Sequence, residues 1–257
     1  MLKKLLASVC GAVAMLAAAP ASAVPVGLEL VLLIDVSGSV DSTEYALQKG
    51  GYVSAFQSAA VQNAILGSQG GAIAVTYVEW SGSGQQSQKV GWTLIDSVGS
   101  ANGFAASIGA VTRAFSGQTA IQTAMQYGAG LFGTETGGLL TNGFESIRQV
   151  MDVSGDGECN DGNCVGGNGR DFALTAGVDT INGLAIGPLA VTNYYNDFVK
   201  GGGGFVIDVA NFTDFAAAIE RKLIKEIRND VPEPMSLALL GIGLIGVGAA
   251  RRRAAKA

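Results

Sequence analysis

Five oxygen-bearing side chains stand at turns next to apolar stretches of this chain. Asp35, Ser37 and Ser39 alternate in the sequence DVSGS, directly after the apolar run LELVLLI. Thr119 lies in SGQTAI, just before a predicted helix, and Asp156 lies in VSGDG, just after a predicted strand. Carboxylate, hydroxyl and water oxygens are the ligands that hard divalent cations prefer. These five residues therefore form a candidate metal site, with Mg²⁺ as the first candidate ion and Mn²⁺ or Ca²⁺ as alternatives.

A simpler explanation of the same residues needs no metal. An aspartate such as Asp35 can cap a helix, and serine hydroxyls often bond the amides of tight turns. That explanation accounts for Asp35 or Ser37, but it does not account for all five residues together.

The surrounding sequence alternates apolar strands with helical stretches and predicts one doubly wound α/β domain with a mostly parallel, six-stranded sheet. The turn GSGQQ is too short for a crossover, so the strand after it is expected to be an antiparallel edge. Ligands of such sheets bind beyond the carboxyl ends of the strands, where Asp35 and Asp156 are expected. Strands are predicted at 28–35, 72–80, 89–95, 148–154, 180–186 and 205–209, and helices at 42–61, 101–114, 120–132, 170–176, 193–200 and 214–227, the last capped by Thr213.

The motif Asp35-x-Ser37-x-Ser39, followed along the chain by Thr119 and Asp156, resembles the metal-ion-dependent adhesion site of von Willebrand factor A domains. The resemblance spans residues 28–228 and implies a Rossmann-like fold. It implies that Ser37 and Ser39 bind the ion directly, Thr119 directly or through water, and the two aspartates often through water. It also implies an open coordination position, which an acidic group of a protein or polysaccharide partner would complete.

Both ends of the chain carry predicted export signals. Residues 1–23 combine two lysines, a short apolar stretch and the small-residue motif ASA, which is typical of a cleavable signal peptide. Residues 231–257 contain Pro232-Glu233-Pro234, the apolar run 235–250 and a basic tail, and they resemble the PEP-CTERM sorting signal of Gram-negative bacteria.

The sorting-signal resemblance implies processing by an exosortase and delivery to the cell surface or the extracellular matrix. The apolar run 235–250 is predicted as a transmembrane helix that anchors the protein transiently in the inner membrane. Residues 24–230 are expected to form the exported domain, with no other membrane contact.

Composition and charge argue against nucleic-acid binding and against histidine-based catalysis. The chain of 257 residues has a formal net charge of −5 and no histidine, so nucleic acid is not an expected partner and the usual catalytic base is missing. We therefore expect a cation-dependent binding protein and not an enzyme. Two alternatives stay open: a structural matrix component whose fold the metal stabilises, and a Mg²⁺-dependent hydrolase.

Two cysteines lie close together after Asp156. Cys159 and Cys164 enclose the sequence NDGN, and an oxidising envelope favours a disulfide between them. The loop they close is expected to rim the metal site, which makes Glu158 a possible ligand contact. Trp80, at the end of the second strand, is a second candidate for the rim, with packing in the core as an equally open role.

Overall fold

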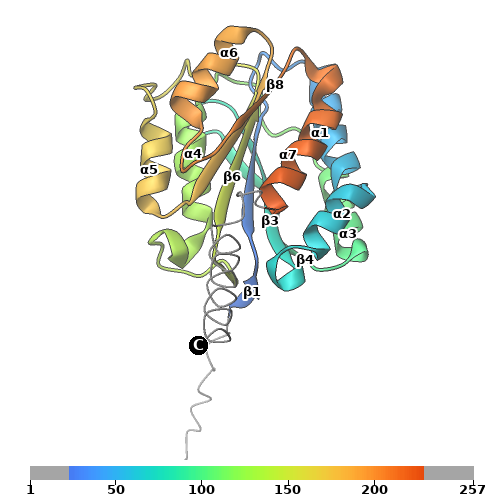
Figure 1. Ribbon diagram of the computed structural model, residues 1–257. Helices are drawn as coiled ribbons and strands as arrows, with labels where there is room; N and C mark the ends of the chain where they lie inside the picture. The colour runs from blue at the N-terminus through green and yellow to red at the C-terminus, as the bar shows by residue number, and fades with distance from the viewer. Residues whose placement is uncertain (1–22, 229–257) are drawn as a thin grey trace, which may run out of the picture.

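The computed structural model describes residues 23–228, in which a central sheet lies between two layers of helices (Figure 1). The predicted transmembrane helix 235–250, the sorting signal and nearly all of the signal peptide lie outside these residues. Within the described part, no helix combines the length and apolar character that crossing a bilayer requires.

The sheet has the predicted architecture, with strand order β4-β3-β2-β6-β7-β8. β4 is an edge strand and pairs antiparallel with β3, whereas the other neighbours pair in parallel. The prediction of six strands with one antiparallel edge is therefore confirmed. The strands are β2 (Glu29–Asp35), β3 (Ile73–Trp80), β4 (Gln86–Ile95), β6 (Gln149–Gly155), β7 (Thr180–Ile186) and β8 (Val206–Val209).

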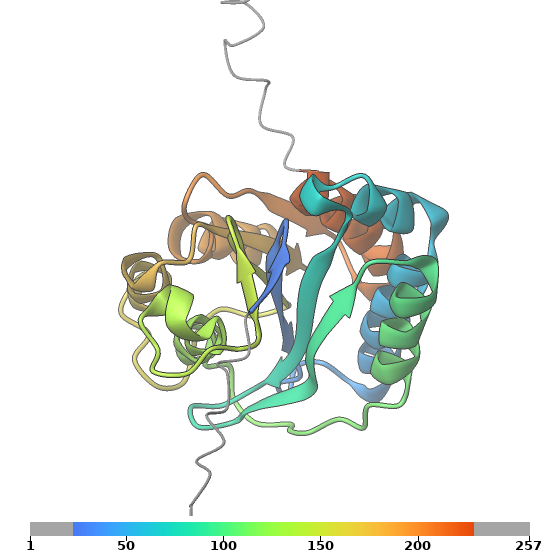
Figure 2. The ribbon, with the colours of Figure 1, turned by 90° about the horizontal axis from the view of Figure 1, so that it is seen from below.

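Helices cover both faces of the sheet, as the view from below shows (Figure 2). One face packs against α1 (Ser42–Gln57), α2 (Ala59–Leu66), α3 (Val98–Gly109) and α7 (Phe215–Arg228). The other packs against α4 (Ile121–Leu131), α5 (Asn168–Ala176) and α6 (Leu189–Tyr194). Successive residues of β2 point into opposite layers: Leu32 belongs to the first apolar core and Leu33 to the second. Burial on both faces explains why residues 30–34 of this strand are all apolar.

The boundaries of several elements differ from the prediction. The single helix expected at 42–61 is two helices, because Ser58 ends α1 and its hydroxyl accepts a hydrogen bond from the Val61 amide to begin α2. α3 begins after Ser97, which caps it, and β4 begins at Gln86. Thr213 does not cap the last helix but lies in the short turn η4 (Phe212–Asp214), which Asn211 caps.

The remaining elements are short. The parallel ribbon of β1 (Val24–Val26) and β5 (Phe144–Ser146) was not predicted, because three residues are too few for a periodic pattern. The predicted helix 193–200 divides between the end of α6 and a single π-type turn, η3 (Tyr195–Val199). Two further turns are η1 (Gln69–Gly71) and η2 (Gly133–Thr136).

Candidate metal centre

The DVSGS turn begins where β2 ends, at the carboxyl edge of the sheet. Asp35 is fully buried there, and its Oδ1 accepts a hydrogen bond of 2.7 Å from the Ser37 amide. This bond holds the turn so that the Oγ atoms of Ser37 and Ser39 lie 3.1 Å apart. α1 begins three residues later, with Asp41 accepting bonds from two amides of its first turn.

Asp156 reaches the same place from the adjacent strand. β6 pairs in parallel with β2, so the two strands end at the same edge of the sheet. The Oγ of Ser39 donates a hydrogen bond of 2.7 Å to Oδ1 of Asp156, across 117 residues of sequence. The pairing of the two strands thus joins the DVSGS turn to the second aspartate.

Thr119 approaches from the segment before α4. Its amide donates to Oδ1 of Asn160 at 2.8 Å, and the Asn160 amide returns a bond of 2.9 Å to the Thr119 carbonyl. The Thr119 hydroxyl lies 3.5 Å from where a Cβ on Gly157 would be, directly beside Asp156. Thr119 and Ser39 line the same open hollow of about 480 Å³, together with Gly38, Gly117, Gln118, Gly157, Glu158, Cys159 and Asn160.

Arg113 holds the backbone of the DVSGS turn, and sequence reasoning missed it. Its guanidinium donates to the carbonyls of Val36, Ser37 and Val40 at 3.0, 2.8 and 2.8 Å. In the sequence, Arg113 lies 73 to 77 residues after the carbonyls that it contacts. No spacing in the sequence links the two, so only the folded chain reveals the contact.

Asp35 is fully buried and Asp156 is partly buried, and neither carboxylate has an ion pair within residues 23–228. Oδ2 of Asp35 is buried and accepts no hydrogen bond within residues 23–228. Burial raises the pKa of Asp35 to about 7, and burial also raises the pKa of Asp156. A divalent cation would compensate both carboxylates, so the donor set fits such an ion.

The oxygen donors of the candidate site also match the ligands that a hard cation prefers. The described residues contain no group of three or more His, Cys, Asp or Glu side chains suited to a metal. This site would instead combine two carboxylates with three hydroxyls, a set that suits a hard cation and not zinc held by nitrogen and sulfur.

Two family models match this chain. Residues 25–231 match the model of a family described as "Protein of unknown function (DUF1194)", and residues 230–253 match the PEP-CTERM protein-sorting motif. The chain belongs to the DUF1194 family. No curated protein matches the chain.

Solved structures with the same fold include a matrix protein and a pilus adhesin. A structure of proximal thread matrix protein 1 from the mussel byssus, described as having a zinc-occupied MIDAS motif, is 16% identical with a TM-score of 0.56; the match covers 80% of this chain and 49% of that one. The pilus adhesin SpaC from Lactobacillus rhamnosus GG is 14% identical with a TM-score of 0.58, over 79% and 30% of the chains.

A von Willebrand factor type A protein from Catenulispora acidiphila is 13% identical with a TM-score of 0.52, over 79% of this chain and 43% of its own. This DUF1194 chain thus has the von Willebrand factor A fold, and it spans less than half the length of each of these three chains.

The two predicted rim residues have different positions in the DUF1194 domain. Glu158 lines the hollow, where a ligand could reach it. Trp80 is 0% exposed and packs in the second apolar core, so of the two roles left open for it the core role is the one observed. Its position at the end of β3 suggested exposure, but the loop segment 117–120 covers that end through bonds to Ser81.

The predicted disulfide between Cys159 and Cys164 is confirmed. The loop it closes is held on two sides. Asp161 accepts bonds from the amide and hydroxyl of Ser83 in the β3–β4 turn, and Asn160 bonds Thr119 as described. The disulfide loop therefore helps to position Thr119, which the sequence did not indicate.

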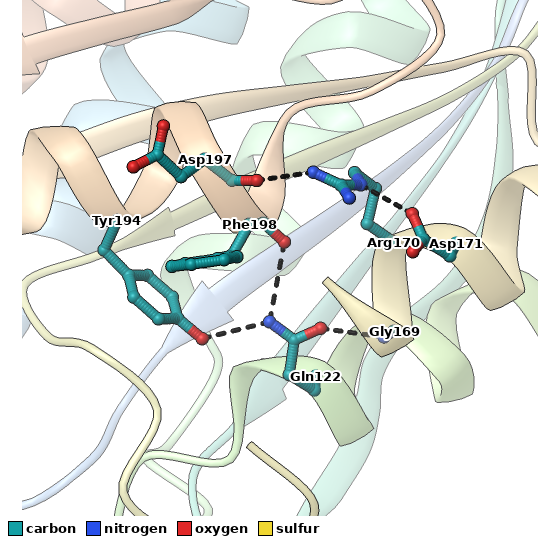
Figure 3. Close-up of polar contacts among 7 residues, drawn as sticks. All are labelled: Gln122, Gly169, Arg170, Asp171, Tyr194, Asp197 and Phe198. Atoms are coloured by element: carbon teal, nitrogen blue, oxygen red, sulfur yellow. Dashed lines mark hydrogen bonds and ion pairs between the residues drawn. The ribbon is translucent and has the colours of Figure 1, made fainter. Parts of the chain in front are cut away.

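A buried glutamine fastens α4, the helix that follows Thr119. Gln122 donates to the Tyr194 hydroxyl at 3.0 Å and to the Phe198 carbonyl at 3.5 Å, and it accepts from the Gly169 amide at 2.7 Å (Figure 3). Arg170 adds a bond of 2.6 Å to the Asp197 carbonyl. These contacts join α4, α5 and the turn η3 into one support on that side of the sheet.

Proposed function

We propose that this protein is an exported binding protein whose ligand affinity depends on a divalent cation at the DVSGS turn. The observation that carries the proposal is the buried, unpartnered Oδ2 of Asp35 beside the linked side chains of Ser37, Ser39 and Asp156. A buried carboxylate oxygen without a hydrogen-bond partner is costly, and a bound cation would remove that cost.

Each residue has a distinct role in this proposal. Ser37, Ser39 and Thr119 would supply hydroxyl oxygens to the ion, and Asp35 and Asp156 would supply negative charge. The bound cation would offer a coordination position to an external oxygen. Mg²⁺ is the proposed ion, with Mn²⁺ and Ca²⁺ as the alternatives to be compared.

The hollow favours an acidic ligand that binds through the cation. None of its nine lining residues is basic, and Glu158 is acidic. An acidic protein side chain or an acidic polysaccharide would therefore find no attractive charge there without the metal. The same lining argues for binding over catalysis, because Glu158 is its one titratable side chain and the chain has no histidine.

The sorting motif supports a place at the cell surface or in the extracellular matrix of a Gram-negative bacterium, after processing by an exosortase. The likeness to a byssus matrix protein and to a pilus adhesin supports an adhesive or matrix role. Both comparisons concern the fold alone. The proposed ligand chemistry is argued from the residues that line the hollow.

The proposal is tested by capture of polysaccharide on the immobilised full chain. Alginate serves as an acidic probe, dextran as its neutral control, and the producing cell's own exopolysaccharide as the third probe. We expect an acidic polysaccharide to bind in Mg²⁺, to be released by EDTA, and not to bind Thr119→Ala. Capture that EDTA leaves unchanged would contradict the proposal; a large fall in Tm with EDTA and no capture would favour the structural alternative.

A further inference from the structure

A second group of charged side chains is sealed inside the domain, away from the metal site. Lys222 and Glu226 lie one turn apart on α7, and Asp152 lies in the middle of β6. Nζ of Lys222 is 2.5 Å from Oδ1 of Asp152 and 2.6 Å from Oε1 of Glu226. The side chains of Lys222 and Asp152 have no exposed surface, and Glu226 is 2% exposed.

The charges of this group do not balance. One ammonium faces two carboxylates, and burial raises the pKa of Asp152 and brings that of Glu226 to about 8. Neither oxygen of Asp152 takes part in a well-oriented hydrogen bond within the described residues, despite the short approach of Lys222. A buried ion group with unsatisfied oxygens is costly.

Proton transfer inside the group would remove every charge. With one proton held on a carboxylate the group is neutral overall. If the Lys222 ammonium then gives a proton to the remaining carboxylate, the result is an amine between two carboxylic acids, with no change in total charge. A low-dielectric interior favours uncharged species over separated ions.

We propose that Lys222 and Asp152 form an intramolecular amide bond that joins α7 to β6. In this step Nζ of Lys222, as the amine, attacks Cγ of the Asp152 carboxylic acid. The new C–N bond forms, the C–O bond of the acid breaks, and one water molecule leaves. Glu226 relays a proton from the attacking nitrogen to the departing hydroxyl, so it is unchanged at the end and no oxidant or other reactant is needed.

The fold supplies what this condensation requires. The strand and the helix hold the two reacting groups in contact, and such fixed proximity replaces a bimolecular encounter in water. Exclusion of water favours amide formation over its reversal. Glu226 lies one helical turn from Lys222, within reach of the nitrogen whose proton it would relay.

The bond would link residues 70 positions apart and secure α7, the last described helix before the sorting motif. α7 would then stay on the sheet when the C-terminal end of the domain is pulled. This inference does not depend on the metal site, because none of the three residues belongs to it.

Peptide mapping of the purified full chain tests the proposal directly. After reduction, trypsin should release residues 149–170 joined to residues 222–225, with a mass one water molecule below the sum of the two peptides. Cleavage after Lys222 should be absent, because an acylated lysine is not a trypsin site. Complete cleavage after Lys222, with residues 149–170 recovered at their unmodified mass, would overturn the proposal and leave a buried ion group.

Two variants test the role of Glu226. Glu226→Gln keeps both reacting groups but removes the proton relay, so we expect most of this variant to lack the linked peptide. Glu220→Gln, on the same helix outside the buried group, should be linked as fully as the wild type. If both variants carry the linked peptide equally, Glu226 does not relay the proton. The peptide map of the wild type tests the amide bond itself, even if Glu226→Gln does not fold.

Discussion

Ser37 takes part in both the local and the long-range contacts of the candidate metal site. Its amide bonds Asp35, its hydroxyl lies 3.1 Å from that of Ser39, and its carbonyl accepts from Arg113. Removal of the hydroxyl would leave the two backbone bonds in place. The side chain can therefore be tested separately from the turn that holds it.

We predict that Ser37→Ala weakens Mg²⁺ binding while the domain stays folded. Loss of residues that merely support metal ligands typically costs ten- to a hundredfold in affinity, so loss of a ligand should cost about tenfold or more. Calorimetric titration of EDTA-treated protein measures the effect, and Ser107→Ala on the exposed face of α3 is the control. An unchanged affinity in Ser37→Ala would remove this residue from the site.

Glu29 leads to a separate prediction about pH. It is buried at the start of β2, and burial together with the nearby Glu135 raises its pKa from 4.5 to about 8. Between those two values the unfolded chain ionises Glu29 while the folded chain keeps it protonated. Its contribution to the free energy of unfolding is therefore present at low pH and is lost as the pH rises towards 8.

Glu29→Gln should remove this contribution, because the amide cannot ionise. Urea denaturation at pH 5 and pH 9 should show a smaller loss of stability in Glu29→Gln than in the wild type or in the exposed variant Glu145→Gln. An identical loss in all three proteins would mean that Glu29 titrates normally in the folded state.

Five site residues could be predicted from the sequence because each stands in a short motif next to an apolar strand or a helix. Arg113 and Asn160 could not, because their contacts with the site join segments far apart in the chain. The sequence left Trp80 open between the rim and the core, because a strand end looks exposed until another loop covers it. A local pattern shows which side chains are available, and tertiary contacts decide which are exposed.

At the scale of elements, α7 shows the same limit. Its apolar residues Phe215, Ile219, Leu223 and Ile227 recur every four positions, as predicted, and all four are buried. The intervening Lys222 and Glu226 would ordinarily be assigned to solvent, yet both are buried against β6. Periodicity identifies the face of a helix that packs, but it does not reveal a charged group that the sheet accommodates.

Two adjacent glycines in α1 provide a matched test of helix packing. A Cβ on Gly50 would meet nothing within 4 Å, whereas a Cβ on Gly51 would lie 2.6 Å from the Phe215 ring of α7. Gly50→Ala should therefore raise the free energy of unfolding by about 1 kcal/mol through helix propensity alone.

Gly51→Ala gains the same propensity but must displace Phe215, so it should be less stable than the wild type. Thermal unfolding of the two variants measures the difference. Equal stabilisation by both substitutions would show that α1 and α7 are not packed as closely as described.

The disulfide loop gives a prediction at the same scale. Cys159 and Cys164 close a short loop, for which the chain-entropy model gives a stabilisation of about 2 kcal/mol. A double Cys→Ser variant should lose about that much in chemical denaturation. It should also bind Mg²⁺ more weakly, because the loop positions Thr119 through Asn160; unchanged stability and affinity would show that the loop is held without the bond.

At the scale of the whole molecule, the candidate metal site and the end of α7 lie towards opposite ends of the sheet. The site occupies the carboxyl edge of β2 and β6, whereas α7 runs back towards the amino edge (Figure 1). Arg148, just before β6 begins, bonds the Glu226 carbonyl near the end of α7. α7, the last described element, therefore ends on the side of the sheet away from the hollow.

The central claim is that oxygen donors from three separate segments hold one cation at that face. The most direct measurement is the anomalous scattering of Mn²⁺ in crystals of the full chain. We predict one strong peak among the side-chain oxygens of Ser37, Ser39, Thr119 and Asp156. A peak at a different place in the protein, or no peak at saturating Mn²⁺, would contradict the account.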